Sequence, residues 1–286
     1  MYDRGWSDGL PLVPPTRERV LRMLEGTSRS GDEVVALMPP NLVDCTVEKV
    51  AVNSVMAGCL PEYLPVVLAS LEAICTDDFN MHGVLATTMG VGPVLVVNGP
   101  IATRIGMNSG VNVLGHGNRA NSTIGRAVQL VVRNVGGGAP GGVDRATLGH
   151  MGKQGFCFAE DEEGSPWTTL AEDRGFDRAQ STVTAFCGEG PRLIVDQQSR
   201  SADSLTRMLA DGLLGVVSSR MVMGMDAMLV LSPEHMARYR DAGWDRARFI
   251  QELSAHLMVD TDTIVAGAGD IDDGLPTGLA GLTLSK

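Results

Sequence analysis

The first third of the chain has apolar residues at helical spacing, bounded by residues that favour helix ends. Thr16 and Thr46 each precede such a run, and a hydroxyl side chain in that position caps the first amides of a helix. Gly26 and Gly58 follow the two runs, where glycine suits the left-handed turn that ends a helix. Pro61 is typical of the first helical position and predicts a third helix. This part of the chain is expected to be mainly helical.

A buried strand and an amphipathic helix are predicted next. The apolar run Val94–Val97 ends in the turn residues Asn98–Pro100. A loop rich in glycine and asparagine, Gly106–Asn121, then leads into a helix capped by Asn121 or Ser122. The apolar stripe of this helix consists of Ile124, Ala127, Val128, Val131 and Val135.

The last third repeats the order of helix, strand and turn. Helices are predicted after Asp203, after Ser232 and after Asp245. Strands are predicted over Ala227–Leu231 and Thr263–Ala266. Because helices alternate with short apolar strands, we predict an α/β fold. We expect two related α/β lobes, in which short sheets are flanked by helices.

Changes in composition divide the chain into four expected parts. The glycine-rich stretch Gly136–Gly142 has the composition of a linker. Residues 1–45 form an N-terminal segment, and residues 46–138 form a first α/β lobe that holds the glycine- and asparagine-rich loop. Residues 139–182 form an irregular connecting segment, and residues 183–286 form a second α/β lobe.

The charge balance and the hydropathy exclude two classes of partner. The chain has 23 Lys and Arg against 34 Asp and Glu, a formal net charge of −11, whereas binding phosphates requires a basic surface. We therefore expect no nucleic-acid partner. No apolar run approaches the ~18 to 20 residues that span a bilayer, and the N-terminus lacks the apolar core of a signal peptide. We expect no membrane association and a cytoplasmic location.

The cysteines do not form a metal-binding or disulfide pattern. The five of them are widely separated, and no C-x-x-C pair occurs. We expect reduced thiols, no metal site and no cofactor. Gly115, Gly117 and Ala120 resemble part of a dinucleotide-binding fingerprint, but that fingerprint follows its strand directly, and here a long loop intervenes after Val97. Nicotinamide binding is not predicted.

Cys59 is the candidate nucleophile. It lies between the end of one predicted helix, at Gly58, and the start of the next, at Pro61. Unpaired amides and the positive end of a helix stabilise a thiolate over a thiol. Glu62 opposes this effect if its carboxylate faces the sulfur. The alternative is that Cys59 is a small apolar residue that fills the corner between two helices.

The loop Gly106–Asn121 is the candidate binding site for a small anionic metabolite. Its glycines permit tight turns, and its amide side chains both donate and accept hydrogen bonds. Arg119 adds a cation that grips a carboxylate or phosphate with two hydrogen bonds, close to a helix N-terminus. The expected substrate-binding residues are Asn98, Asn108, Asn112, Asn118, Arg119 and Asn121. The alternative is an ordinary surface loop.

Two histidines are candidates for proton transfer. His116 lies in the glycine-rich loop, and His235 follows a predicted strand at the start of a helix. For each of these histidines, the alternative is a structural role. The acidic run Glu160–Glu163 could attract a divalent metal, but it lacks the alternating spacing of ligands and is interpreted as a solvated loop.

Three arginines lie seven residues apart and are expected on one side of the helix near Asn121. They are Arg119, Arg126 and Arg133. A solvated stripe is the simplest interpretation. A contact between subunits is the alternative, because the rest of the chain is acidic. We expect a homo- or hetero-oligomer.

Four segments carry a resemblance to a known family. They are Gly5–Pro11 with Pro14–Thr16, Val55–Val66, the glycine-rich loop with Ile124–Arg126, and Ser232–His235. In these motifs the chain resembles a little-characterised bacterial and fungal family associated with UGSC-type selenoproteins. The resemblance implies a function linked to a thiol or selenol, in a complex with a selenoprotein-like partner that carries the redox centre. The chain has no Cys-Gly-Ser-Cys motif of its own.

Three hypotheses of function follow. The first is an enzyme acting on an anionic carboxylate metabolite, with Cys59 as nucleophile or redox thiol and His116 or His235 as proton carrier. The second is a cofactor-independent lyase or hydratase, in which the loop and Arg119 stabilise an enolate-like charge and Cys59 only packs. The third is a non-catalytic subunit of a selenoprotein-like complex.

Overall fold

The structure is a computed structural model that describes residues 1–216, 226–260 and 283–285. The chain forms two compact units. Unit 1 comprises Met1–Glu162 and Thr169–Pro191, and unit 2 comprises Glu163–Thr168 and Arg192–Lys286. The predicted α/β fold, with short sheets flanked by helices, is confirmed.

Unit 1 holds most of the regular structure. Its helices are η1 (Tyr2–Arg4), α1 (Arg17–Leu24), α2 (Val47–Ala57), η2 (Pro61–Tyr63), α3 (Leu64–Ile74), α4 (Met81–Ala86), α5 (Pro100–Arg104), α6 (Arg119–Asn134), η3 (Met151–Gln154) and η4 (Glu172–Arg174). Its strands are β1 (Val34–Met38), β2 (Val43–Thr46), β3 (Gly92–Asn98), β4 (Cys157–Ala159) and β5 (Thr182–Gly188).

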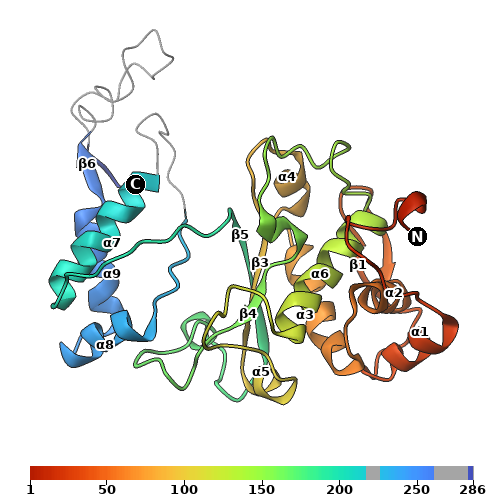
Figure 1. Cartoon of the computed structure of the whole chain (residues 1–286), viewed down its shortest axis with the longest axis horizontal. Helices are drawn as coiled ribbons and strands as arrows, with labels where there is room; N and C mark the ends of the chain where they lie inside the picture. The colour runs from red at the N-terminus through yellow and green to blue at the C-terminus, as the bar shows by residue number, and fades with distance from the viewer. Residues whose placement is uncertain (217–225, 261–282, 286) are drawn as a thin grey trace, which may run out of the picture. The chain divides into compact units, whose positions relative to one another are not determined.

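The core of unit 1 is built around β3. This strand lies between β4, to which it is parallel, and β5, to which it is antiparallel, and all of its residues are buried. Figure 1 shows α3 and α6 on one side of this sheet, where α3 packs against β5 and α6 against β4. The helix α2 packs on α6 as a further layer, and the antiparallel pair β1–β2 lies beside α3. A strand buried on both faces must be apolar throughout, as Val94–Val97 is.

The helix ends of unit 1 follow the predicted local rules. Thr16 and Thr46 cap α1 and α2, each accepting a hydrogen bond from the amide three residues later. Gly58 ends α2 in the left-handed conformation, with φ of 93°. The apolar stripe of α6 is buried from Ile124 to Val131, so this helix supplies one wall of the core.

The predicted boundary at Gly136–Gly142 is wrong, because this stretch packs within unit 1. The carbonyl of Gly136 accepts from Asn41 N at 3.1 Å. A side-chain carbon at Gly136 would collide with the carbonyl oxygen of Pro39. The glycines therefore permit close approach of two backbone segments, where the composition suggested a linker. The expected connecting segment 139–182 likewise contains β4 and the start of β5, and the chain passes between units at 162–163, 168–169 and 191–192.

Unit 2 is mainly helical. Its described elements are α7 (Ala202–Val216), α8 (Pro233–Asp241), α9 (Arg246–His256), β6 (Met258–Asp260) and β7 (Thr283–Ser285), and β6 pairs with β7 in antiparallel orientation. Ser232 and Asp245 cap α8 and α9, as predicted. The core of unit 2 is an aromatic cluster of Trp167, Tyr239, Trp244 and Phe249, with neighbouring ring centroids 5.0–5.9 Å apart.

The strand predicted over Ala227–Leu231 is absent. Residues 226–232 have no regular secondary structure. A run of apolar residues becomes a strand only where a neighbouring strand supplies hydrogen bonds, and no strand in the described part of the chain pairs with this run. This run therefore gives no support to the expectation that the two lobes are related. The strand predicted over Thr263–Ala266 lies outside the described residues.

Candidate functional site

The start of α6 is the best-defined polar site in unit 1. Asn118 caps the helix: its Oδ1 accepts from Asn121 N at 3.0 Å, and its Nδ2 donates to Gly106 O at 2.8 Å. The predicted cap at Asn121 or Ser122 is wrong by one helical turn. Gly117, with φ of 114°, permits the turn that places Asn118 in this role. The cap also ties the two ends of the loop together.

The other loop asparagines hold the shape of the loop. Asn108 donates to Val111 O at 3.0 Å, and Asn112 donates to His116 O at 2.8 Å. Asn121 is buried and forms two bonds with the backbone of Asn108, donating at 2.9 Å and accepting at 3.1 Å. These amide NH₂ groups therefore bond to loop carbonyls. Their expected role as direct ligand contacts stays a prediction.

Arg119 fixes the start of α6 against the end of α2. Its Nε and Nη2 donate to Gly58 O at 3.0 and 2.9 Å, and the side chain is exposed. Its Nη1 group forms no hydrogen bond with any residue that the structure describes. The structure thus brings Arg119 beside Gly58–Cys59, as predicted for the candidate site.

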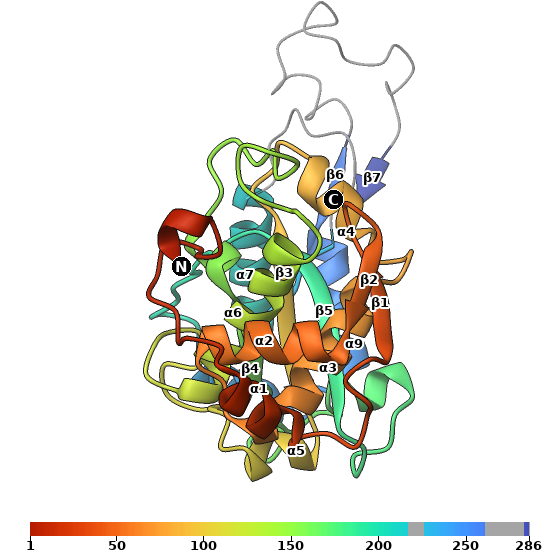
Figure 2. The same cartoon turned by 90° about the vertical axis from the view of Figure 1, so that its right-hand side faces the viewer.

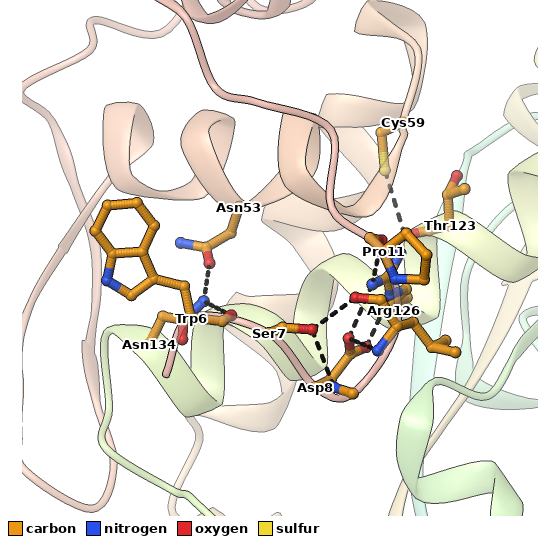
Figure 3. Close-up of polar contacts among 11 residues, drawn as sticks. Trp6, Ser7, Asp8, Pro11, Asn53, Cys59, Thr123, Arg126 and Asn134 are labelled. Carbon is orange, nitrogen blue, oxygen red and sulfur yellow. Dashed lines mark hydrogen bonds and ion pairs between the residues drawn. The ribbon is translucent and has the colours of Figure 1, made fainter. Parts of the chain in front are cut away.

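The expected acidic thiol at Cys59 is contradicted. The residue is 7% exposed, and its Sγ donates to Thr123 O at 3.3 Å (Figure 3). Burial raises the pKa of the Cys59 thiol to about 12, although the charges of Arg119 and Arg126 act in the opposite direction. The amide of Cys59 itself donates to Ser54 O, and the following helix begins at Pro61, which has no N–H. Cys59 is thus a packed thiol.

We expect native Cys59 to resist alkylation. With iodoacetamide near neutral pH, mass spectrometry should find no modification of Cys59 until the chain is unfolded, because a buried thiol lacks both access and thiolate character. Free cysteine in the same tube controls for reagent activity. Rapid, selective labelling of Cys59 in the folded protein would contradict this prediction and restore the nucleophile hypothesis.

The other cysteines are packed as well. Burial raises the pKa of Cys45 to about 11 and of Cys75 to about 12, and it also raises the pKa values of Cys157 and Cys187. All five cysteines are free thiols in the structure. None of them has the environment of an activated nucleophile.

The two candidate histidines lie in different units. His116 is exposed in the loop of unit 1, two residues before the cap of α6. His235 lies in the first turn of α8 in unit 2, where its amide donates to Ser232 Oγ at 3.4 Å. Only His116 therefore shares a unit with Arg119 and Cys59. The proton-transfer role of each histidine stays a prediction.

Asn98 lies at another place in unit 1, at the end of β3. It is 1% exposed, and its Nδ2 donates to Glu160 Oε2 at 2.6 Å and to Glu162 Oε1 at 2.8 Å. The described hydrogen bonds of its side chain are thus to the acidic run and not to the glycine-rich loop. Sequence reasoning missed this pairing, since the run was interpreted as a solvated loop. The sequence has no local signal for it, because β4, which ends immediately before Glu160, is a three-residue strand that forms beside β3.

Two of the three arginines in the stripe of α6 bind the N-terminal segment of the same chain. Arg126 forms an ion pair with Asp8 at 2.8 Å and donates to Pro11 O at 2.9 Å. Arg133 donates to Gly5 O at 3.4 Å. The expected solvated stripe is therefore corrected, because the arginines meet acceptors within unit 1. The expected contact between subunits stays a prediction.

Figure 3 shows how this docking is completed. The turn at Ser7 is closed by its hydroxyl, which donates to Leu10 O at 2.6 Å and accepts from Gly9 N at 3.0 Å. Asn134 donates to Trp6 O at 3.1 Å and to Asn53 Oδ1 at 2.9 Å. Figure 2 shows the N-terminal segment running beside α6 toward α1. The motif Gly5–Pro11 thus has a structural role on this helix.

Comparisons with known proteins leave the family open. No protein-family model, no curated protein and no solved structure matches this chain. The resemblance to the family associated with UGSC-type selenoproteins therefore stays a prediction. Among the described helices, none combines the length and the apolar character that crossing a bilayer requires. In the described ranges, no group of three or more His, Cys, Asp or Glu side chains is placed to share one metal ion.

Proposed function

We propose that this protein is an enzyme that binds a small carboxylate metabolite at the N-terminus of α6 and moves a proton on it, as lyases and hydratases do. The observation that carries the proposal is the guanidinium of Arg119. It is exposed at the positive end of a 16-residue helix and held there by two hydrogen bonds to Gly58 O. A cation that is already fixed in place binds an anion without a further loss of side-chain freedom.

The backbone supports an anion at the same point. The amides of Arg119 and Ala120 stand in the first turn of α6, where no helical carbonyl precedes them. Asn118 satisfies only the amide of Asn121. Helix N-termini attract carboxylates and phosphates through such amides and through the helix dipole.

His116 is the group that we assign to proton transfer. It lies in the loop that Asn112 and Asn118 hold in shape, close in sequence to Arg119. Removal of a proton beside a carboxylate leaves an enolate-like negative charge, which Arg119 and the helix end would stabilise. Cys59 acts in this mechanism by packing the corner behind Arg119, in agreement with its raised pKa.

Binding is tested by calorimetric titration of the full chain with short mono- and dicarboxylates. We expect Arg119→Gln to weaken binding about tenfold or more, because a hydrogen bond to a charged group contributes roughly 1.5–3 kcal/mol. Arg119→Lys should give an intermediate affinity, since lysine keeps the charge but not the forked geometry. Arg22→Gln is the matched control, an exposed arginine on α1. Equal affinities of Arg119→Gln and wild type would overturn the proposed site.

The chemical step is tested in the same samples. In deuterated water, NMR should show exchange of the proton next to the carboxylate of the bound acid, and His116→Gln should slow it. His82→Gln, on α4 and also exposed, is the control. Binding without exchange in wild type would reduce the proposal to a binding protein.

A further inference from the structure

The strand β5 forms one edge of the three-stranded sheet β4-β3-β5 along its whole length. All of its residues pair with β3, from Thr182 opposite Asn98 to Gly188 opposite Gly92, without a register shift. On its other side, β5 pairs with no strand in the described part of the chain. Such an edge presents unpaired backbone groups that can bind a further strand.

The backbone groups that face outward are those of Val183, Ala185 and Cys187. On the other side of β3, Leu95 N donates to Phe156 O, so the backbone of Leu95 faces β4. Hydrogen-bonded and non-hydrogen-bonded pairs alternate in an antiparallel ladder, which makes Leu95 and the opposite Ala185 a non-hydrogen-bonded pair. Three amides and three carbonyls of β5 therefore point away from the sheet. Within the described ranges, none of these groups forms a hydrogen bond.

The strand β5 lacks the features that usually protect an edge. Its sequence, Thr-Val-Thr-Ala-Phe-Cys-Gly, contains no charged residue and no proline, and six of its seven residues are only half-buried. Other strands of unit 1 do carry protection: β4 has only three residues, and the β1–β2 pair has a register shift and the charged Asp44. An unprotected edge of this length indicates that another strand covers it.

We propose that β5 binds β5 of a second copy of this chain, in antiparallel orientation and centred on Ala185. In this register Ala185 lies opposite Ala185 of the partner subunit, and Val183 lies opposite Cys187 of the partner subunit. Each such pair exchanges two hydrogen bonds, so every outward amide and carbonyl in both copies gains a partner. The two three-stranded sheets become one continuous sheet.

The side chains of β5 suit a second copy as the partner. Val183, Ala185 and Cys187 pack against the core of unit 1, so Thr184 and Phe186 lie on the opposite face of the sheet. The register places Thr184 opposite Phe186 of the partner subunit, and aromatic and β-branched residues stabilise each other across strands. Two copies with a net charge of −11 repel each other, but contact through an uncharged strand sets no like charges directly opposite one another.

The oligomeric state tests the proposal. Sedimentation of the full chain over a concentration series should show an equilibrium between monomer and dimer. Ala185→Pro removes an outward amide and keeps the bonds between β5 and β3, and proline is tolerated at such edge positions. It should weaken dimerisation about tenfold or more, because the two central hydrogen bonds of the dimer are lost. Ala185→Ser keeps the amide and is the matched control, which should dimerise as wild type does.

Disulfide cross-linking tests the register without a change in the backbone. Opposite residues of a non-hydrogen-bonded pair have Cα atoms about 4.5 Å apart, within the range of a disulfide, whereas diagonal neighbours at ~7–8 Å are too distant. Thr184→Cys and Phe186→Cys chains should therefore cross-link when they are mixed and oxidised, and neither should cross-link alone. Wild type, with its five free thiols, controls for unspecific oxidation.

Three results would overturn the proposal. The first is a wild-type chain that sediments as a monomer at every concentration. The second is a dimer that folded Ala185→Pro leaves unchanged, which would place the contact on another surface. The third is a mixture of the two cysteine variants that cross-links no more than each variant alone. Melting curves show whether Ala185→Pro is folded, and if it is not, the mixed cross-linking decides.

Discussion

Replacement of Arg126 by glutamine is expected to lower the free energy of unfolding by about 3 kcal/mol, the lower end of the cost of breaking a buried ion pair. The side chains of Arg126 and Asp8 are only 14% and 13% exposed. Arg126 Nε and Nη2 each donate a hydrogen bond of 2.8 Å to the Asp8 carboxylate, and Nη2 also donates to Pro11 O. Without it the Asp8 carboxylate stays half-buried with no cation, and the N-terminal segment loses its main attachment to α6.

Urea denaturation followed by circular dichroism measures this effect, with Arg22→Gln as the exposed control. The double variant Arg126→Gln with Asp8→Asn should be more stable than the sum of the single effects predicts, because the unpaired charge is then gone. If Arg126→Gln unfolds at the same urea concentration as wild type, the pair does not hold the N-terminal segment.

The same pair gives the stability a dependence on pH. Burial alone would raise the pKa of Asp8, but the hydrogen bonds and charge of Arg126 outweigh it and hold the pKa below the ordinary 3.8. A carboxyl group with a depressed folded pKa contributes stability above its unfolded pKa and loses it as the pH falls through the folded value. The difference in stability between wild type and Asp8→Asn should therefore be largest near neutral pH and shrink below about pH 4.

Replacement of Tyr239 by alanine is expected to destabilise unit 2 by about 3–4 kcal/mol, as truncation of a large buried aromatic side chain does. Tyr239 is fully buried, and its ring contacts Trp167, Trp244 and Phe249. Its hydroxyl bonds Thr206 Oγ1 at 3.2 Å. Because this cluster is the core of unit 2, a cavity at its centre leaves the surrounding helices without their main packing partner.

Two measurements separate the units. Trp167 and Trp244 belong to unit 2 and Trp6 to unit 1, so the loss of buried tryptophan fluorescence during denaturation reports mainly on unit 2. Hydrogen exchange followed by mass spectrometry should show faster exchange in α7–α9 and unchanged protection in α2, α3 and α6. Tyr2→Ala, at a largely exposed tyrosine, is the control. Equal loss of protection in both units would show that they unfold as one.

Local signals in the sequence predicted the helices well. The caps Thr16, Thr46, Ser232 and Asp245 act on amides three residues away, so neighbouring residues decide them. Gly58 ends α2 for an equally local reason. The start of α6 was missed by one turn because Asn118 and Asn121 are both good caps, and the bond from Asn118 to Gly106 favours the first.

Strand pairing and burial could not be predicted in the same way. β4 has only three residues, and it is a strand because β3 lies beside it. Ala227–Leu231 has a strand-like composition but no described partner. The prediction of an acidic thiol at Cys59 was wrong for a related reason. Burial raises its pKa, and this burial involves segments distant in the sequence, such as the one that carries its hydrogen-bond partner Thr123. Asn98 lies at a strand end, as expected, but the partners of its side chain are Glu160 and Glu162, and its predicted contact with a substrate stays a prediction.

The central position of β3 has a consequence for synthesis of the chain. The ribosome completes β3 at residue 98, yet its neighbours arrive much later, since Leu95 pairs with Cys157 and Gly92 with Gly188. Until then β3 is an apolar strand with unpaired backbone groups on both edges, and such edges promote aggregation. Closure of loops this long also slows folding. Unit 1 can therefore be completed only after translation has passed β5. In a nascent chain that stops earlier, at least one edge of the apolar strand β3 remains unpaired.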